Sequence, residues 1–497
     1  MFEDQIMSPP LLGDLNDPQR DSVTHGDGPL LILAGAGSGK TRVLTRRIAY
    51  LVHEKNLAPE RILALTFTNK AAGEMAGRVE QLLGMPVRGL WIGTFHSICL
   101  RLLRRHGTLL GYGPSLSVFD ADDQRGLVRR LLKEEGLEEG PRRARDLLGI
   151  ISRAKTAGLG AEAFREQART PAQRVAATVY ERYESALRTQ NAADFDDLLL
   201  QALRLMREHP DVADRYAERF RHVLVDEYQD TNRVQFLLVE RLARTHRNIF
   251  VVGDDDQSIY GWRGADVKNI IDFREHFPDA TVYRLEQNYR STGAILSFAN
   301  AVIRHNESRW EKELWTEREE GPKPQLVVTS DEDEESEEIA RRVAALTSRA
   351  DCPHGSIAVF YRTHAQSRPL EDAFLRSHIP YVLVGGVYFY QRREVKDLLS
   401  YLRVLANPRD EVSLRRALSV PRRGVGETSI DRLLETARSR GCDPLDLAAE
   451  GGPDSVRGKA RKALGEFGAL MLALRERLAE PPERILGEII ERISFKR

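Results

Sequence analysis

The sequence predicts an α/β fold in which parallel sheets are flanked by helices. Short apolar runs without polar alternation, typical of strands buried on both faces of a parallel sheet, occur at 30–33 and 62–67. Segments with apolar residues at helical spacing follow both runs. The 497 residues are also enough for several domains, since one domain commonly takes about 150 residues.

The composition excludes several other classes of protein. Hydrophobic residues make up 41% of the chain, which is enough apolar material for folded cores and excludes wholesale disorder. No apolar run reaches the roughly 18 residues of a membrane span, and three cysteines are too few for a disulfide framework. The formal net charge is zero, yet a large chain can confine basic surface to one cleft and still bind nucleic acid.

The first sheet is predicted from four strands. The strand at 30–33 leads through a glycine-rich loop into a helix, and the strand at 62–67 leads into a helix at 71–83. Two further runs of the same type lie at 223–225 and 249–252. Between the first two strands and these two runs, the charged stretch from about 120 to 204 is rich in Leu, Arg, Glu and Ala, so we interpret it as a helical insertion.

A second parallel sheet is predicted farther along the chain. Its strands are expected at 325–328, 357–361 and 381–384, with helical patterns between them. From about Gln391 to the end, the pattern is again helical.

The loop from Ala34 to Thr41 has the composition of a phosphate-binding loop. It follows a strand and opens a helix, so small residues allow backbone N–H groups to approach phosphates at the helix N-terminus. Lys40 supplies a charge for the outer phosphates, and the Thr41 hydroxyl suits Mg²⁺. Ala34 replaces the usual first glycine. A glycine-rich turn without a ligand is the alternative, which the agreement of motif and context disfavours.

Two carboxylates at the end of the 223–225 strand complete this pattern. Asp226 is expected to hold Mg²⁺, and Glu227 to orient and deprotonate an attacking water. Taken alone, such a pair is often only a helix cap. Together with the loop, it predicts a magnesium-dependent nucleoside triphosphatase.

Several short segments in a fixed order identify the type of triphosphatase. They are Thr66–Lys70, Thr94–Ser97, Asp226–Thr231, Val252–Ala265 and Leu285–Ser291. Together they resemble the UvrD/PcrA/Rep family of superfamily 1 DNA helicases. The resemblance implies P-loop, RecA-like motor domains with inserted helical subdomains, and ATP and Mg²⁺ as cofactors. It implies a first motor domain at 1–117 and 200–287, a helical insertion at 118–199, the N-terminal part of a second motor domain at 288–390, and an incomplete helical accessory domain at 391–497.

The resemblance also assigns the nucleotide-binding residues. Gln19 would read the adenine edge, Tyr289 would stack on the base, and Arg290 would contact the γ-phosphate. Gln257 and Gln229 would link the γ-phosphate to the DNA groove. The remaining nucleotide-binding residues expected from the loop are Ala36, Gly37, Ser38, Gly39, Lys40, Thr41 and Arg42. A GTPase is disfavoured, because the segment 69–72 lacks the acidic residue that reads guanine.

Aromatic residues interleaved with basic ones predict a single-strand DNA surface. Phe67, Tyr260 and Trp262 could stack on successive bases, and Arg263 could contact phosphates. Core packing is the alternative, but Tyr260 and Trp262 lie in a polar, turn-like loop that favours exposure. Further DNA contacts implied by the resemblance are Asn69, His96, Arg362, His364, Gly424 and Gly426. His364 stands where relatives often carry Asn, and a plain turn is the alternative for the two glycines.

Two functions remain open from the sequence. The first is a 3′-to-5′ DNA helicase and translocase in DNA repair or replication, cytoplasmic and bacterial. Such a helicase would act on single strands and ss/ds junctions, with repair proteins as partners, as a monomer or DNA-induced dimer and without a membrane. The family's C-terminal motifs, including a second γ-phosphate arginine, do not occur before Arg497, so we expect a truncated form. The second function is therefore an ATP- and ssDNA-binding module without productive helicase cycling.

Overall fold

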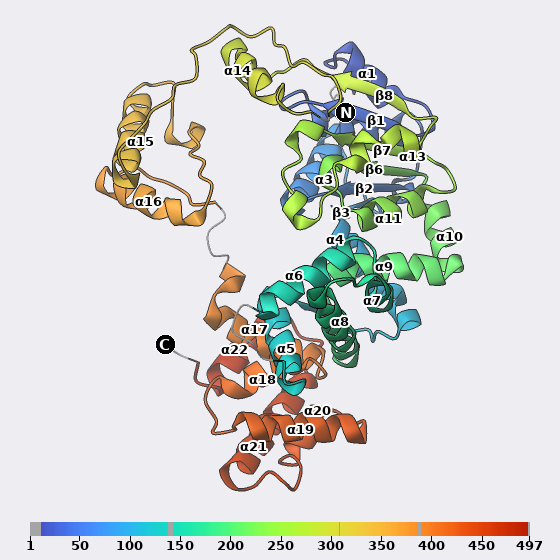
Figure 1. Ribbon diagram of the computed structural model, residues 1–497, viewed down its shortest axis with the longest axis vertical. Coiled ribbons are helices and arrows are strands. Elements are labelled where there is room, and N and C mark those ends of the chain that lie inside the picture. Colours follow the sequence, from blue (N-terminus) through green and yellow to red (C-terminus); the bar gives the residue numbers. More distant parts are fainter. Residues whose placement is uncertain (1–10, 138–142, 308, 385–388, 496–497) are drawn as a thin grey trace, which may run out of the picture. The chain divides into compact units, whose positions relative to one another are not determined.

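The computed structural model describes residues 11–137, 143–307, 309–384 and 389–495 (Figure 1). The chain divides into two compact units. One runs to Gly321 and resumes at Ser400, and the other runs from Pro322 to Leu399. Among the described residues, no helix has the length and apolar character needed to cross a membrane.

A six-stranded parallel sheet forms the centre of the first unit, in the order β3-β2-β6-β7-β1-β8. The four predicted strands are confirmed as β1 (Leu30–Ala34), β2 (Ile62–Thr66), β6 (His222–Val225) and β7 (Ile249–Gly253). Every residue of these four strands is buried. Burial on both faces explains why their sequences show no polar alternation.

The two edge strands were not predicted. They are β3 (Trp91–Thr94) and β8 (Thr281–Leu285). Most of β8 is only half-buried, and it includes the exposed Arg284. An edge strand covers less of the core, so it needs fewer apolar residues and gives a weaker signal.

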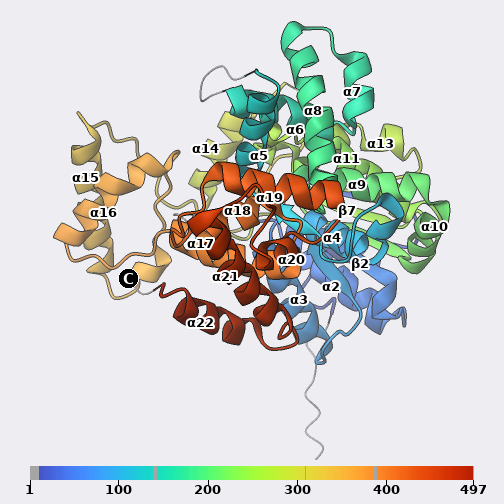
Figure 2. The same cartoon turned by 90° about the horizontal axis from the view of Figure 1, so that it is seen from below.

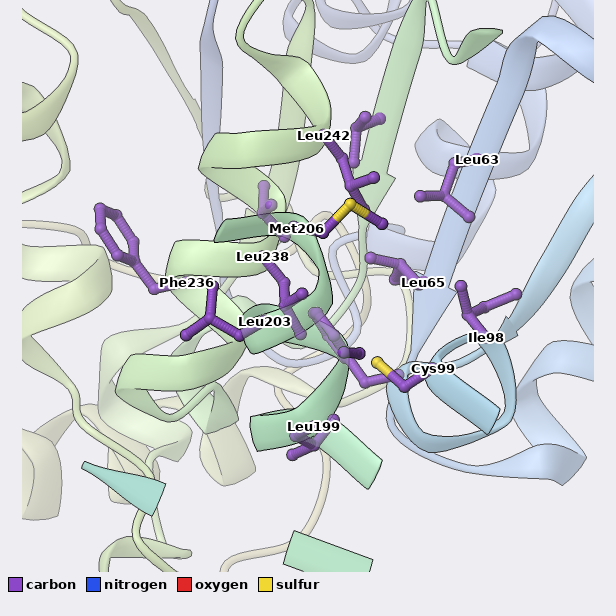
Figure 3. Close-up of a cluster of buried hydrophobic side chains, with 14 of the residues drawn as sticks. Leu63, Leu65, Ile98, Cys99, Leu199, Leu203, Met206, Phe236, Leu238 and Leu242 are labelled. Atoms are coloured by element: carbon purple, nitrogen blue, oxygen red, sulfur yellow. The ribbon is translucent and has the colours of Figure 1, made fainter. Parts of the chain in front are cut away.

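Helices cover both faces of the sheet. On one face, Leu30 and Ile32 share a core with α1 (Asp17–Thr24), α2 (Lys40–His53) and α3 (Asn69–Leu83). On the other face, Leu31 and Leu33 belong to a second core. That core is formed with α4 (Phe95–His106), α9 (Phe195–Glu208), α10 (Pro210–Arg219) and α11 (Arg233–Ala243). Figure 3 shows this second core, where side chains of β2 face those of α4, α9 and α11.

The stretch from about 120 to 204 is largely helical, as predicted, and it includes one strand of a small pair. Within it are the helices α5 (Ala121–Glu134), α6 (Arg143–Thr156), α7 (Ala161–Gln167) and α8 (Pro171–Thr189). They enclose a core of their own. The strands β4 (Ser117–Phe119) and β5 (Ala192–Asp194) pair in parallel where the chain enters and leaves these helices.

The helical prediction for the C-terminal region also holds within the described residues. The helices are α17 (Arg393–Ala406), α18 (Glu411–Ser419), α19 (Glu427–Arg440), α20 (Pro444–Ala449), α21 (Gly458–Arg475) and α22 (Pro482–Arg492). Helix α20 packs against α19 and α21 (Figure 2). Between β7 and the second unit lie α12 (Lys268–Ile271), α13 (Phe273–His276) and α14 (Gly293–Ile303).

The predicted strands of the second unit are wrong for this structure. The unit holds α15 (Glu332–Thr347) and α16 (Ser367–Arg376) around a small apolar core, but segments 325–328, 357–361 and 381–384 form no ladder. Leu326 and Phe360 are both 92% exposed. An apolar run becomes a strand only when a partner strand satisfies its backbone groups, and no described segment does so here.

Candidate functional site

The phosphate-loop candidate connects β1 to α2. Gly37 and Gly39 have φ angles of +72° and +96°, which L side chains rarely adopt. A Cβ on Gly37 would lie 2.6 Å from Asn288 Nδ2. Gly39 is the N-cap of α2 and offers no side-chain cap, so N–H groups at this helix end can bind an anion.

Side chains from two distant segments hold this loop in place. Gln19 Nε2 donates to the Ser38 carbonyl at 2.9 Å. From the segment after β8, Asn288 Nδ2 donates to the Ala36 carbonyl at 2.5 Å, and the Tyr289 backbone N–H donates to the Gly37 carbonyl at 3.0 Å. The loop is therefore shaped before any ligand arrives, which lowers the ordering cost of binding.

Lys40 points into this site without a hydrogen-bond partner among the described residues. Its Nζ is buried and lies 3.4 Å from Glu227 Oε2. The Glu227 carboxylate balances this charge at that distance, while the N–H donors of the ammonium stay free for a further anion. The donor set of Lys40, the glycine-rich loop and the α2 N-terminus therefore fits a polyphosphate.

Asp226 and Glu227 place two carboxylates beside Lys40, as predicted. Burial and, second, the Glu227 charge raise the pKa of Asp226 to about 6, against the opposing effect of Lys40. Asp230, which the sequence did not single out, has its pKa raised to about 6 by burial and by Glu227, again opposed by Lys40. A divalent cation would relieve this crowding of negative charge. The Asp226 carboxylate and the Thr41 hydroxyl are therefore suitable ligands for Mg²⁺.

A line of hydrogen bonds connects Glu227 to Gln257. Gln229 Nε2 donates to Glu227 Oε2 at 2.8 Å, and its Oε1 accepts from the Asp254 backbone N–H at 2.9 Å. Gln257 Nε2 then donates to Asp254 Oδ2 at 2.5 Å. The two glutamines predicted to couple the sites are thus joined through Asp254, a residue that was not predicted.

The residues expected around the adenine are engaged within the protein. The Gln19 side chain is fully buried, and its Oε1 accepts from the Asn16 backbone N–H at 3.3 Å in a capping box. In this structure Gln19 therefore shapes the loop, and its contact with the base remains a prediction. The Tyr289 ring is 43% exposed, with its hydroxyl accepting from Asn16 Nδ2 at 2.8 Å. Arg42 pairs with Asp14.

The predicted aromatic residues lie at the surface and outside the core, with Trp262 exposed and Phe67 and Tyr260 partly buried. The Phe67 and Tyr260 ring centroids lie 5.0 Å apart, and those of Tyr260 and Trp262 lie 6.4 Å apart. Trp262 is 73% exposed, and the Arg263 guanidinium lies 4.6 Å from its ring centroid. We call Phe67, Tyr260, Trp262 and Arg263 the aromatic surface. A flat exposed ring beside a cation, with two partly exposed rings next to it, suits stacking on nucleic-acid bases.

Other predicted nucleic-acid contacts are exposed or partly exposed in separate places. Asn69 is exposed at the start of α3. His96 lies 5.7 Å, centroid to centroid, from the half-exposed Phe195, and burial lowers the pKa of His96. Phe195 was missed, although an apolar residue directly after the Asp194 helix cap could have drawn attention to it.

The remaining predicted contacts lie later in the chain. Arg362 and His364 are exposed in the second unit. Gly424 and Gly426 lie exposed in the loop that precedes α19. Arg423 lies in the same loop, after α18 and just before Gly424. Its side chain points inward and donates to Tyr401 Oη at 2.6 Å.

Comparison with known proteins gives two family matches. The model described as UvrD/REP helicase N-terminal domain matches residues 15–278, and the one described as UvrD-like helicase C-terminal domain matches residues 283–451.

Individual relatives cover nearly the whole chain. The ATP-dependent DNA helicase PcrA of Staphylococcus epidermidis is 44% identical over 486 residues, which are 98% of this chain and 66% of that protein. PcrA of Bacillus subtilis is 45% identical over 457 residues, which are 92% of this chain and 62% of that protein. The chain thus spans about two thirds of the length of the curated relatives it matches.

Proposed function

Because this chain belongs to the UvrD/Rep helicase family, we propose that it is an ATP-dependent DNA helicase and translocase. It would use Mg²⁺ and move 3′ to 5′ along single-stranded DNA during repair or replication. One observation carries the proposal: Lys40 forms an ion pair with Glu227, and hydrogen bonds run from Glu227 through Gln229 and Asp254 to Gln257, in the segment that continues to the exposed Trp262. A DNA translocase needs such a connection between its nucleotide-binding site and its DNA-binding surface.

On the nucleotide side, each residue has a role that its position supports. Lys40 and the amides of the loop would bind the β- and γ-phosphates, and the exposed Arg290 would reach the γ-phosphate. Bound Mg²⁺, held by Asp226 and Thr41, would neutralise phosphate charge. Glu227 would accept the proton of the attacking water, while Gln229 holds its carboxylate in place.

On the DNA side, the aromatic surface would stack on bases without regard to sequence. Base–aromatic stacking contributes about 1–3 kcal/mol per base. Arg263 would add phosphate contacts, which make binding weaker as the salt concentration rises.

A second candidate function is an ATP- and ssDNA-binding module without helicase cycling. One observation favours it: segments 325–328, 357–361 and 381–384 of the second unit form no ladder among the described residues. Those three segments therefore contribute no strands of a second motor sheet in the part of the chain that the structure describes.

Steady-state ATP turnover with and without single-stranded DNA, followed by a strand-separation assay, distinguishes these functions. A helicase shows turnover that DNA stimulates, together with separation of a duplex that carries a 3′ tail. A binding module binds ATP and DNA but shows neither activity. Failure to bind either ligand would contradict both proposals.

A further inference from the structure

Three consecutive aspartates after β7 surround one buried lysine. Lys312 Nζ lies 3.0 Å from Asp254 Oδ1, 2.5 Å from Asp255 Oδ1 and 2.7 Å from Asp256 Oδ2. The Lys312 side chain is 3% exposed, and none of the three carboxylates exceeds 7%. We call these four residues the Lys312 cluster.

Lys312 is the cation of this cluster. Carboxylate oxygens of the three aspartates lie within 4.8 Å of one another, a grouping that could otherwise hold a metal ion. Burial by itself would lower the pKa of Lys312, but the surrounding carboxylates, Asp254 foremost, raise it overall. The ammonium therefore stays charged and compensates buried negative charge, which would otherwise be strongly unfavourable.

The segment around Lys312 is anchored to the same aspartates. Arg309 Nη2 lies 2.9 Å from Asp256 Oδ2, and the Trp310 backbone N–H donates to Asp255 Oδ2 at 2.8 Å. The Trp310 indole N–H donates to the Ile270 carbonyl at 3.2 Å. These contacts fix the backbone that carries Lys312, so the ammonium is held in one position.

Asp254 connects Lys312 to the coupling glutamines. One of its carboxylate oxygens faces Lys312, and the other accepts from Gln257 Nε2. Its backbone N–H donates to Gln229, whose amide also holds Glu227. A carboxylate pinned at one oxygen can rotate little, so Lys312 restricts the orientation of Gln257.

The Lys312 cluster is also connected, along the chain and through hydrogen bonds, to the aromatic surface and to the phosphate loop. The chain after Gln257 continues directly into Tyr260 and Trp262 of the aromatic surface. The chain after Lys312 reaches Trp315, whose carbonyl accepts from the Asn288 N–H at 2.7 Å. Asn288 in turn holds the phosphate loop through the Ala36 carbonyl.

We propose that Lys312 is a positioning residue that couples nucleotide binding to single-strand binding by holding Asp254, and through it Gln257. This inference rests on the proposed function for the identity of the two ligands. It assigns Lys312 no contact with either ligand.

The test is the energetic coupling between the two sites. The ssDNA dissociation constant is measured with and without a non-hydrolysable ATP analogue, and the ratio of the two values is the coupling factor. Such factors are commonly about 5 to 150. We expect Lys312→Met to bring the ratio to within about twofold of one, with each separate affinity changed by less than about threefold.

Three further measurements separate coupling from folding. Because Lys312→Met leaves three buried carboxylates, the double variant Lys312→Met with Asp254→Asn removes one charge of each sign, and we expect it to fold and lack coupling. Lys323→Met, at an exposed lysine, should keep the coupling factor. In steady state, DNA-stimulated kcat of the double variant should fall about tenfold while KM for ATP stays within about threefold.

The outcomes are distinct. If either folded Lys312 variant keeps the coupling factor of the unaltered chain, or if the unaltered chain binds both ligands without coupling, the inference is wrong. If the unaltered chain binds neither ATP nor ssDNA, the proposed function fails instead.

Discussion

Lys40 Nζ lies 3.4 Å from Glu227 Oε2 and, although buried, makes no hydrogen bond among the described residues. Glu227 also accepts a hydrogen bond from the Gln229 side chain, and Gln229 in turn accepts one from the Asp254 backbone N–H. Lys40, the residue best placed to bind phosphate, therefore lies next to Glu227, where the line of hydrogen bonds to Gln257 begins. Loss of phosphate from this site would change the charge that Glu227 faces.

Lys40→Ala is expected to reduce ATP turnover by at least about a hundredfold, because a charge that stabilises the transition state is lost. Binding of single-stranded DNA should stay within about threefold, since Lys40 is not part of the aromatic surface. Turnover is measured with a coupled assay, and DNA binding by fluorescence anisotropy. Normal DNA-stimulated turnover in the variant would contradict the role of Lys40.

Trp262→Ala is expected to weaken ssDNA binding by about 1–3 kcal/mol, because one stacking platform is lost. ATP affinity without DNA should not change. Phe298→Ala is the matched control, since Phe298 is a 60% exposed aromatic on α14, outside the aromatic surface. Equal losses in both variants would indicate a nonspecific effect of removing an exposed ring.

Gly37→Ala is expected to lower ATP affinity severely. The new Cβ would require a φ of +72° and would lie 2.6 Å from Asn288 Nδ2, so the loop or Asn288 must shift. Gly73→Ala, at a position in α3 with no atom within 4 Å of the added Cβ, should bind ATP normally. Isothermal titration with ATP analogues measures both variants, and unchanged affinity in Gly37→Ala would show that the loop does not hold the nucleotide.

Because of Asp226, we expect the free energy of unfolding of the ligand-free protein to depend on pH. Its pKa is raised to about 6 in the folded chain, so the folded state binds the proton more tightly than the unfolded state. Stability from this group is present at acidic pH and is lost as the pH rises from about 4 through 6. Asp226→Asn should therefore stabilise the protein more at pH 7.5 than at pH 5, by roughly 1–2 kcal/mol.

Denaturant unfolding at the two pH values measures this difference. Asp17→Asn is the control, because Asp17 is exposed in the first turn of α1 and its side chain is 87% accessible. An equal effect of Asp226→Asn at both pH values would show that the carboxyl group is not perturbed in the folded state.

Lys155→Met is expected to destabilise the helical insertion by about 3–5 kcal/mol. Lys155 Nζ is fully buried, 2.7 Å from Asp194 Oδ2 and 2.8 Å from Asp197 Oδ1, so its removal leaves uncompensated carboxylates. Lys133→Met, at an exposed lysine of α5, should unfold like the unaltered chain. Chemical denaturation followed by circular dichroism measures both, and equal midpoints would contradict a structural role for Lys155.

Local patterns predicted much of the first unit. The strand before Ala34, the glycine-rich loop and the helix from Lys40 are contiguous, so their geometry follows from neighbouring residues. Trp262 was placed on the surface because its loop is polar, and the structure confirms its exposure. The same reasoning was wrong for 325–328, where an apolar run exists but no partner strand lies beside it among the described residues.

Local sequence patterns were enough to predict the α/β class, the phosphate loop with Lys40, the carboxylates Asp226 and Glu227, and the family resemblance. The tertiary structure was needed to show that Gln19 is committed to the loop and that Asn288 holds it in place. It alone also showed that Lys312 compensates three aspartates more than fifty residues earlier in the chain. The difference follows from distance along the chain: adjacent residues specify a loop or strand, whereas a buried charge meets its partner only when the whole chain has folded around it.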